Sequence, residues 1–479
     1  MDGTSPRPNL SLRQTAALTA LGVISFHLAY NFAAGSFLIV VYLGGLASLA
    51  WQPTNRRAFY FGLSAGLLAY APQLSCFYAI FGAAALALWL VLAFWIGLFG
   101  LTARLCLVRF GPRWAMAFIP VVWTGLEYFR SECYYLRFTW LNAGYAFSDH
   151  VQSVPFRLFG VYGVGFLLMF FATGLTSMTM ASLPWRLKLT RRAALASGGG
   201  VLALTALASW TNFKPSVPTP SHTNGLAVAG VQMEHPGDPQ LVTDLNKLKK
   251  QHPEASLLVL SEYTFTEPLP DIVKKWCRSN QRYLIVGGKD FVDEQKFFDT
   301  AFVIDPQGEI VFRQAKSMPI QFFNDGLPAR EQKLWNSPWG KIGICICYDL
   351  SYTYVADRLV RLGAQALVVP TMDVVEWGRH EHELHARIAP IRAAEYGVPI
   401  FRVASSGISQ LVDARGNVTA TAPFPGEDAP ISGWLELGKP GQVPFDRVMA
   451  KAAVWLTAFL LGWVALPATF RQRFRQRVR

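Results

Sequence analysis

The chain has 479 residues, of which 52% are hydrophobic and only 16% charged, against about 25% charged in an ordinary soluble domain. Its formal net charge is +13, and the positive excess lies in residues 1–215, with 15 Lys and Arg against 4 Asp and Glu, and in residues 448–479, with 6 against none. This composition excludes a disordered chain and a nucleic-acid-binding tail protein, and it predicts an integral membrane protein with a water-exposed domain.

Long uncharged runs predict membrane helices. No Asp, Glu, Lys or Arg occurs for 42 residues between Arg13 and Arg56, or for 46 residues between Arg57 and Arg104. A span needs about 20 helical residues, so breaks at 31–36 and 72–75 divide these runs into two hairpins of two helices. Further spans are predicted at 114–129, 155–182, 193–210 and 452–468, which gives seven helices and then one more.

Lys and Arg fall in alternate loops of this arrangement. The clusters at 7–13, 56–57, 104–113, 186–192 and 471–479 lie on one side, which the positive-inside rule assigns to the cytoplasm. Residues 131–155 and 216–447 then lie on the opposite side. We therefore expect a multi-pass protein of the cell inner membrane whose water-exposed domain faces the periplasm. A cleaved signal peptide is the alternative interpretation of the first helix.

From residue 225 the pattern changes to short apolar runs rich in Val, Ile and Leu, separated by polar segments of helix length. This alternation predicts an α/β domain with two packed sheets flanked by helices. We expect strands at 226–232, 256–260, 283–287, 301–304, 310–313, 342–347, 366–369, 400–403, 410–413 and 433–437, and helices at 239–251, 270–279, 352–362 and 380–396. The predicted domains are a seven-helix transmembrane domain at 1–215, the α/β domain at 216–447, and a transmembrane helix with a basic tail at 448–479.

Cys347 ends the apolar run KIGICIC, just before a predicted helix. A cysteine at such a turn is exposed at the sheet edge, where backbone N–H groups and the positive end of the helix lower its pKa and bind an oxyanion. This position favours a nucleophile, with a small core residue as the alternative. For Cys345, two residues earlier, the core interpretation is favoured.

Glu262 closes the apolar run ASLLVLSE, and Lys316 follows the strand EIVFRQAK in the same manner. A base at position 262 is chemically reasonable, yet each of the two residues, taken singly, is also explained as a solvated loop residue. The order Glu, Lys, Cys, with each residue at the end of a predicted strand, makes joint chemistry the stronger hypothesis.

This ordered trio resembles the Glu-Lys-Cys triad of the nitrilase superfamily. The local motifs LSEYTF at 260–265, CYD at 347–349, RAAE at 392–395 and SSGIS at 405–409 agree with it. A nitrilase-like α/β domain placed between seven helices and one last helix resembles the bacterial apolipoprotein N-acyltransferases. WTGLEYFR at 123–130, FTWLNAGY at 138–145 and GVYGVGF at 160–166 resemble membrane segments of the same family, so the resemblance covers nearly the whole chain.

The resemblance implies a covalent reaction without a metal or other cofactor. Glu262 is expected to act as the base, Lys316 to stabilise the oxyanion, and Cys347 to carry the acyl group as a thioester. The implied donor is a membrane phospholipid and the implied acceptor is the N-terminal S-diacylglyceryl cysteine of an apolipoprotein, in a protein that is a monomer. Alternatives are a nitrilase-like membrane amidase, an acyltransferase with another amine acceptor, and an inactive membrane scaffold.

Two further carboxylates are assigned supporting roles, Asp325 and Asp349. After the triad lysine the family shows a Pro-Phe-Gly-Glu stretch, whereas this chain reads KSMPIQFFNDGLPA, in which Asp325 is the nearest carboxylate. Asp349 belongs to the CYD motif.

Two other groups of polar residues invite a functional interpretation. Histidines 380, 382 and 385 lie close in sequence to Glu381 and Glu383, but their spacing is not HExxH, so a solvated helix start is favoured over a metal site. Glu127 and Arg130 lie one helical turn apart near a membrane boundary. We expect them to pair with each other and hold helices together, or to mark a functional site.

Overall fold

The computed structural model of the protein describes residues 10–151, 153–182 and 225–465. These residues belong to two compact units. The first contains the described residues of 10–146, 159–182 and 445–465, and all its elements are helical; the second contains those of 147–158 and 225–444 and holds the strands. The predicted span at 193–210 lies outside the described residues.

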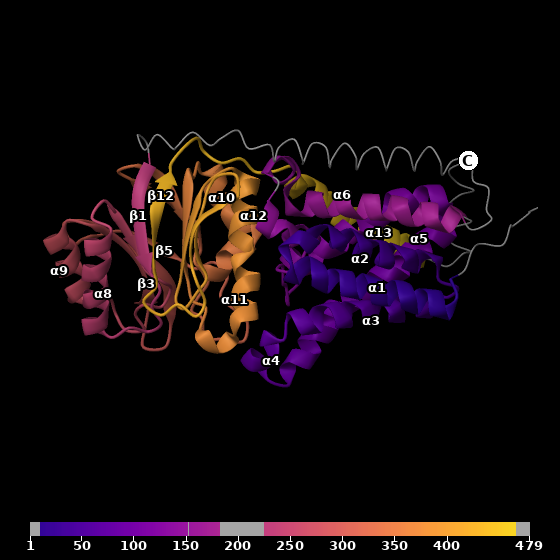
Figure 1. Ribbon diagram of the computed structural model, residues 1–479, viewed down its shortest axis with the longest axis horizontal. Coiled ribbons are helices and arrows are strands. Elements are labelled where there is room, and N and C mark those ends of the chain that lie inside the picture. The colour runs from indigo at the N-terminus through magenta and orange to yellow at the C-terminus, as the bar shows by residue number, and fades with distance from the viewer. Residues whose placement is uncertain (1–9, 152, 183–224, 466–479) are drawn as a thin grey trace, which may run out of the picture. The chain divides into compact units, whose positions relative to one another are not determined.

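The first unit consists of helices (Figure 1). Three of its helical segments are long and apolar enough to cross a membrane, namely Ala33–Trp51, Ala84–Cys133 and Ser153–Met180. The elements are α1 (Leu12–Asn31), the 3-10 turn η1 (Ala33–Leu38), α2 (Ile39–Ser48), η2 (Leu49–Trp51), α3 (Asn55–Gln73), α4 (Cys76–Phe81), α5 (Ala84–Tyr128), the π-helical η3 (Phe129–Cys133), η4 (Ala143–His150), α6 (Ser153–Ser182) and α13 (Asp446–Ala465).

The breaks in these helices have local causes. Ser11 caps α1 by accepting a hydrogen bond from the Gln14 backbone, and the helix ends at Asn31, where the first hairpin was predicted to break. The fourth and fifth predicted spans are continuous as α5, with a kink at Gly111, whose φ of 77° lies outside the helical region. Glycine adopts this conformation without a steric penalty, so the chain changes direction there.

Glu127 and Arg130 are buried, but the expected pairing between them is wrong: no ion pair joins them in the described part of the chain. The Glu127 carboxylate accepts a hydrogen bond from the Ala143 backbone over 3.0 Å. Arg130 donates to Asn142 Oδ1 over 3.0 Å and lies 5.4 Å from the centre of the Tyr70 ring. The segment after η3 supplies Ala143 and Asn142, so both side chains hold that segment, and Tyr70 is contributed by α3.

The second unit contains two six-stranded sheets, with strand orders β12-β1-β2-β3-β4-β5 and β11-β10-β9-β8-β7-β6. Parallel pairing occurs for β1 with β2, β2 with β3, β7 with β8 and β8 with β9. The strands are β1 (Gly225–Val231), β2 (Leu257–Val259), β3 (Tyr283–Phe291), β4 (Phe297–Ile304), β5 (Ile310–Ala315), β6 (Leu334–Ser337), β7 (Gly340–Ile344), β8 (Ala366–Thr371), β9 (Ile400–Ala404), β10 (Ser409–Val412), β11 (Val418–Ala422) and β12 (Pro430–Glu436).

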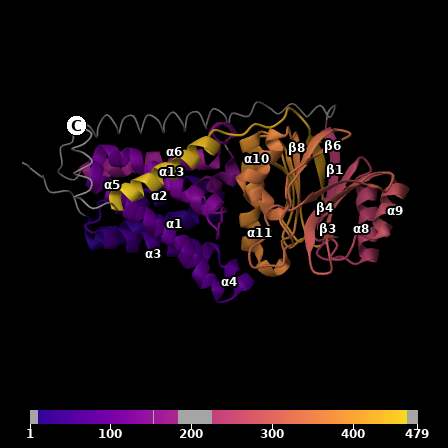
Figure 2. The same cartoon turned by 180° about the vertical axis from the view of Figure 1, so that it is seen from behind.

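Helices cover the outer face of each sheet (Figures 1 and 2). Helices α8 (Asp238–Gln251) and α9 (Asp271–Asn280) pack on the first sheet through a core that includes Leu245, Trp276 and Val286. The second sheet is covered by α10 (Thr353–Arg361), α11 (Arg379–Ala386) and α12 (Ile388–Tyr396). Between the sheets, a Cβ on Gly230 would lie 2.7 Å from Val403, so the inner faces are in close contact.

The prediction of helices that precede an α/β domain of two packed sheets is confirmed, with three differences in detail. The strands β6 and β11 were missed because both lie at sheet edges and have short sequences that mix apolar with polar residues. Strand β7 ends at Ile344, three residues before Cys347. The helix predicted at 380–396 is two helices, since Pro390 has no backbone N–H and is tolerated only in the first turn of a new helix.

Candidate active site

The three residues predicted at strand ends lie together in the second unit. Glu262 follows β2, Lys316 follows β5 and Cys347 follows β7. Lys316 Nζ lies 2.7 Å from Glu262 Oε1, and both side chains are fully buried. The interpretation of Glu262 and Lys316 as solvated loop residues is therefore wrong, because the loops turn inward between the two sheets.

A small residue on the next strand permits this position of Glu262. A Cβ added to Gly287 of β3 would lie 2.5 Å from the Glu262 Cα and 2.8 Å from the Ser261 carbonyl oxygen. Such distances are too short for any side chain at 287, so glycine there lets the chain after β2 pass directly over β3.

Met372 connects Glu262 and Cys347 through its backbone. Its N–H donates to Glu262 Oε2 over 2.7 Å, and its carbonyl oxygen accepts from the Cys347 thiol over 3.7 Å. Met372 directly follows β8, the neighbour of β7 in the second sheet. The backbone at the end of β8 thus holds a carboxylate and a thiol in one site.

The Cys347 backbone is unusual, with φ at 49°, and the residue opens the 3-10 turn Cys347–Ser351. The residue is 2% exposed, so the predicted exposure at the sheet edge is wrong. The predicted lowering of its pKa is also wrong. Burial raises the pKa of the thiol well above its ordinary value, the charge of Glu262 raises it further, and the charge of Lys316 opposes both. This direction agrees with the position of the thiol as a hydrogen-bond donor to the Met372 carbonyl oxygen.

Asp325 contacts the lysine directly. Its Oδ2 lies 2.7 Å from Lys316 Nζ and accepts the Ile320 N–H over 2.7 Å. Its Oδ1 accepts a hydrogen bond from the Tyr263 hydroxyl over 2.8 Å. A side chain as short as aspartate therefore reaches Lys316 in this chain, and Tyr263, which the sequence did not single out, helps to hold it there.

Asp349 joins the segments that carry Lys316 and Cys347. Its carboxylate accepts the backbone N–H groups of Ser317, Met318 and Ile346 over 3.0, 2.7 and 3.2 Å. Burial raises the pKa of Asp349 to about 7, against the opposing effects of Lys316 and these N–H groups. The residue ties the turn after β5 to the turn after β7.

A further buried acid, Asp299, also faces Lys316, with its Oδ2 3.6 Å from Nζ. It lies inside β4, so no strand-end signal pointed to it. The lysine is therefore surrounded by three carboxylates, those of Glu262, Asp299 and Asp325.

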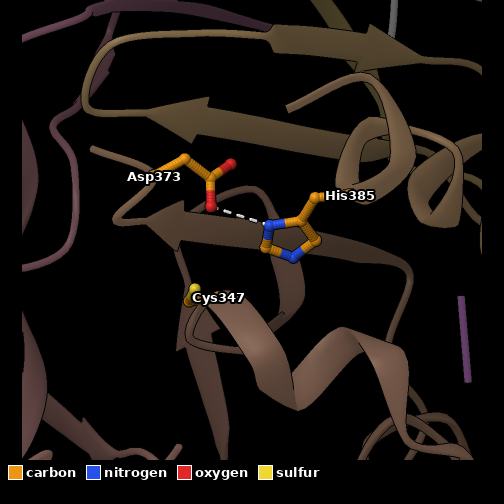
Figure 3. Close-up of side chains that lie close together, drawn as sticks. All are labelled: Cys347, Asp373 and His385. Carbon is orange, nitrogen blue, oxygen red and sulfur yellow. Dashed lines mark hydrogen bonds and ion pairs between the residues drawn. The ribbon is translucent and has the colours of Figure 1, made fainter. Parts of the chain in front are cut away.

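The histidine segment is not the solvated helix start that we expected. His382, His385 and Glu381 are buried, because α11 turns this face toward the second sheet. His385 Nδ1 lies 2.8 Å from Asp373 Oδ1, and this pair lies near Cys347 (Figure 3). Arg402 of β9 also donates to the Asp373 carboxylate.

The buried residues Asp373, His385 and Arg402 form a second cluster, in which the Asp373 carboxylate contacts both of the other side chains. Burial raises the pKa of Asp373, but His385 and Arg402 outweigh it, so the pKa is below its usual range. Burial lowers the pKa of His385 more than Asp373 raises it.

Two sets of side chains have the donor atoms that a metal ion needs, within 4.8 Å of one another: Cys347, Asp373 and His385, and the three carboxylates around Lys316. Each set already encloses a cationic side chain, Arg402 in the first and Lys316 in the second. Each set of donor atoms thus has a protein cation paired with one of its carboxylates.

A cavity of about 180 Å³ opens beside Lys316. Its inner wall is polar, and its mouth is formed by Ile320, Phe323 and Trp377, of which the two aromatic rings lie 6.4 Å apart. Phe323 and the neighbouring Phe322 are exposed. Apolar and charged side chains thus line the same cavity.

Comparison with known proteins adds two matching families. Residues 17–174 match the apolipoprotein N-acyltransferase N-terminal domain, and residues 252–431 match the carbon-nitrogen hydrolase family. Apolipoprotein N-acyltransferase of Geobacter metallireducens is 23% identical over 84% of this chain and 88% of its own length. The enzyme of the same name from Shewanella oneidensis is 24% identical over 86% and 89%. Among solved structures, Saccharomyces cerevisiae Nit3, a nitrilase-superfamily member, is 20% identical with a TM-score of 0.39, over 44% of this chain and 90% of that one.

Both family domains occur in this order in one chain, and named relatives align with most of its length. The chain is therefore similar to the apolipoprotein N-acyltransferases over most of its length, and it combines the N-terminal domain of that family with a carbon-nitrogen hydrolase domain.

Proposed function

We propose that the protein is a phospholipid-dependent N-acyltransferase that moves a fatty acyl group through a thioester on Cys347 to the N-terminal S-diacylglyceryl cysteine of apolipoproteins. The observation that carries this proposal is the bonded sequence from Lys316 to Glu262, from Glu262 to the Met372 backbone, and from that backbone to the Cys347 thiol. It provides a cation, a base and a nucleophile in one buried site.

In the first half-reaction, Glu262 takes the proton of the Cys347 thiol while the sulfur attacks an ester carbonyl of the phospholipid. The carbonyl π electrons move to oxygen, and Lys316 stabilises the resulting oxyanion. Burial lowers the pKa of Lys316, but Glu262 and Asp325 more than reverse this, so the amine stays charged. The ester C–O bond then breaks, and the lysophospholipid oxygen takes the proton from Glu262.

In the second half-reaction, the α-amine of the acceptor attacks the thioester carbonyl. Glu262 accepts the proton of the amine, the new C–N bond forms and the C–S bond breaks. The Cys347 thiolate leaves and regains its proton from Glu262, which restores the resting enzyme. A raised thiol pKa suits this cycle, because it makes proton transfer to and from Glu262 part of each half-reaction.

The surroundings of the site support lipid substrates. The aromatic mouth of the cavity and the exposed Phe322 offer an apolar path to Lys316, and three apolar helices give the protein a membrane domain. We further propose a cell inner membrane location with the 216–447 domain in the periplasm, domain limits at 215 and 447, and a monomer. The Lys and Arg distribution supports the inner membrane location with the 216–447 domain in the periplasm.

The direct test supplies purified protein in detergent with a phospholipid and a peptide bearing an N-terminal diacylglyceryl cysteine. An acyltransferase adds one fatty-acyl group to the peptide amine, with lysophospholipid formed in equal amount. A hydrolase releases free fatty acid whether or not the peptide is present, and a scaffold forms neither product. Acylated Cys347 beside unmodified peptide would point to another amine acceptor.

Intact-protein mass in the same assay tests the nucleophile. Cys347→Ala should lose the acyl increment, whereas Cys345→Ala, the matched control two residues away, should keep it. Cys345 is fully buried, and its backbone N–H donates to Val368 as part of the sheet. An acyl increment that persists in Cys347→Ala would refute the proposed thioester.

A further inference from the structure

We propose that Asp299 carries a proton in the resting enzyme and donates it as a hydrogen bond to Glu262, which makes Asp299 a positioning residue for the base. This inference rests on the proposed function of Glu262, and it concerns a residue inside a strand that no motif marks.

Asp299 is placed to act on the site from the first sheet. It lies in β4, is fully buried, and its backbone carbonyl accepts the N–H of Lys316 over 2.8 Å. Its side chain faces the lysine, with Oδ2 3.6 Å from Nζ. This separation is longer than a hydrogen bond, whereas Glu262 and Asp325 each approach Nζ to 2.7 Å.

Neither carboxylate oxygen of Asp299 has a hydrogen-bond partner among the described residues. An ionised carboxylate only accepts hydrogen bonds, and burying one without a donor is strongly unfavourable. A protonated carboxyl group brings its own donor. The acceptor oxygens of Glu262 and Asp325 lie within 4.8 Å, so the donor has a partner at hand.

Glu262 is the better acceptor of the two. Asp325 already receives the Tyr263 hydroxyl, the Ile320 N–H and the Lys316 ammonium. Among the residues that the structure describes, Glu262 receives only Lys316 and the Met372 N–H. A carboxylate has about four acceptor positions, so a bond from Asp299 leaves one for the thiol proton.

The balance of charge in the site also favours a proton on Asp299. Three carboxylates surround one ammonium group, and the reaction adds a thiolate in the same buried space. With Asp299 neutral, one excess negative charge remains before the reaction starts, in place of two. Burial raises the pKa of Asp299, and the charge of Glu262 raises it further, against the opposing effect of Lys316.

Loss of this proton at alkaline pH should slow the enzyme, because a second anion beside Glu262 disfavours formation of the thiolate. The titratable groups that face Asp299 come from every neighbouring element. They are Glu262 and Tyr263 after β2, Lys316 after β5, Asp325 in the following loop, and Lys289 opposite on β3, whose ammonium lies 4.8 Å from the Phe297 ring centre.

Two substitutions distinguish a protonated Asp299 from an ionised Asp299. The amide of Asp299→Asn donates to Glu262 as the acid does and cannot ionise, so the acylation rate at neutral pH should stay within about threefold of wild type. Asp299→Ala leaves Glu262 without this donor and should lose at least about tenfold. The alkaline fall in rate should be present in wild type and absent from Asp299→Asn.

A second pair of measurements needs no acyl substrate, so it stays decisive if the proposed function fails. The first is the rate at which iodoacetamide labels Cys347, measured on the peptide that contains this residue. This rate should fall at alkaline pH in wild type and not in Asp299→Asn. The infrared spectrum of wild type minus Asp299→Asn, taken in an ester-free detergent, should contain the C=O band of a protonated carboxyl. Asp290→Asn, at an exposed ion pair with Arg313, is the matched control and should change neither.

An Asp299→Asn protein as slow as Asp299→Ala would overturn the proposal, since it would mean that a negative charge is needed. The proposal would also be overturned if wild type and Asp299→Asn showed the same dependence of labelling rate on alkaline pH, or if the infrared band were missing. If Cys347 is never acylated but labelling and infrared results agree with the proton on Asp299, the proposed function fails and this inference stands.

Discussion

The backbone N–H of Met372 donates to the Oε2 oxygen of Glu262 over 2.7 Å. The carbonyl of the same residue accepts from the Cys347 thiol, so one residue orients the proposed base and the proposed nucleophile. The next residue, Asp373, is fixed in turn by Arg402 and His385. Because both of these hydrogen bonds run through the Met372 backbone, their geometry depends on where β8 ends.

Glu262→Gln should leave the protein folded and block thioester formation. A neutral amide keeps most of the shape of the side chain but cannot accept the thiol proton. We expect a loss of at least about a hundredfold in the acylation rate, the usual contribution of a general base. The measurement is the acyl increment on intact protein after mixing with phospholipid, with thermal unfolding as the control for the fold. Acylation at the normal rate would contradict the role of Glu262.

Gly287→Ala should disable the site through the backbone. The added methyl group would lie 2.5 Å from the Glu262 Cα, so the chain after β2 has to move. Overpacking of this kind costs about 1–3 kcal/mol of stability. We expect a lower Tm and slow acylation.

Gly288→Ala, on the same strand, is the control, because its nearest contact would be 3.2 Å. It should cost less stability and keep more activity. An equal loss in both variants would show that the strand and not the position of Glu262 is the cause.

Burial of His385 should make the folded protein less stable at acidic pH. Burial lowers the pKa of this histidine in the folded protein, so the unfolded chain binds the proton more readily. The stabilisation is complete above the unfolded pKa of about 6.5 and declines as the pH falls below it. Between about pH 7.5 and 5.5 the Tm of wild type should therefore fall more than that of His385→Asn.

His380→Gln is the matched control for this experiment, since His380 lies on the same helix but is partly exposed. It should keep the wild-type dependence of Tm on pH. Parallel Tm curves for wild type and His385→Asn would contradict the prediction.

The topology predicted from the positive residues can be tested with reporter fusions. Fusions at Arg57, Arg109 and Arg192 should report the cytoplasm, and fusions at Asp149 and His222 the periplasm. The C-terminal tail should report the cytoplasm. A periplasmic tail would contradict the count of eight spans.

Residues at strand ends could be predicted from the sequence, because an apolar run marks where a strand stops. Glu262, Lys316 and Cys347 all follow this rule and lie in one site. Asp299 could not be found in this way, since it interrupts a strand and its role depends on Lys316 after the next strand.

The buried histidines were missed for a different reason. A helix that starts with Arg, His and Glu has the composition of an exposed helix, and only its packing shows that Glu381, His382 and His385 share a buried face. The partners of His385, Asp373 and Arg402, come from other elements. Such contacts are set by tertiary packing, which periodicity along one helix does not record.

The burial of Cys347 also bears on the lifetime of the proposed acyl intermediate. The residue is 2% exposed, so a thioester formed there is shielded from bulk water, which is the competing nucleophile. How long the intermediate survives then depends on the arrival of an amine and little on hydrolysis. On the proposed mechanism, the enzyme is charged with an acyl group well before its acceptor arrives, and it keeps the activated acyl group while acceptors are scarce.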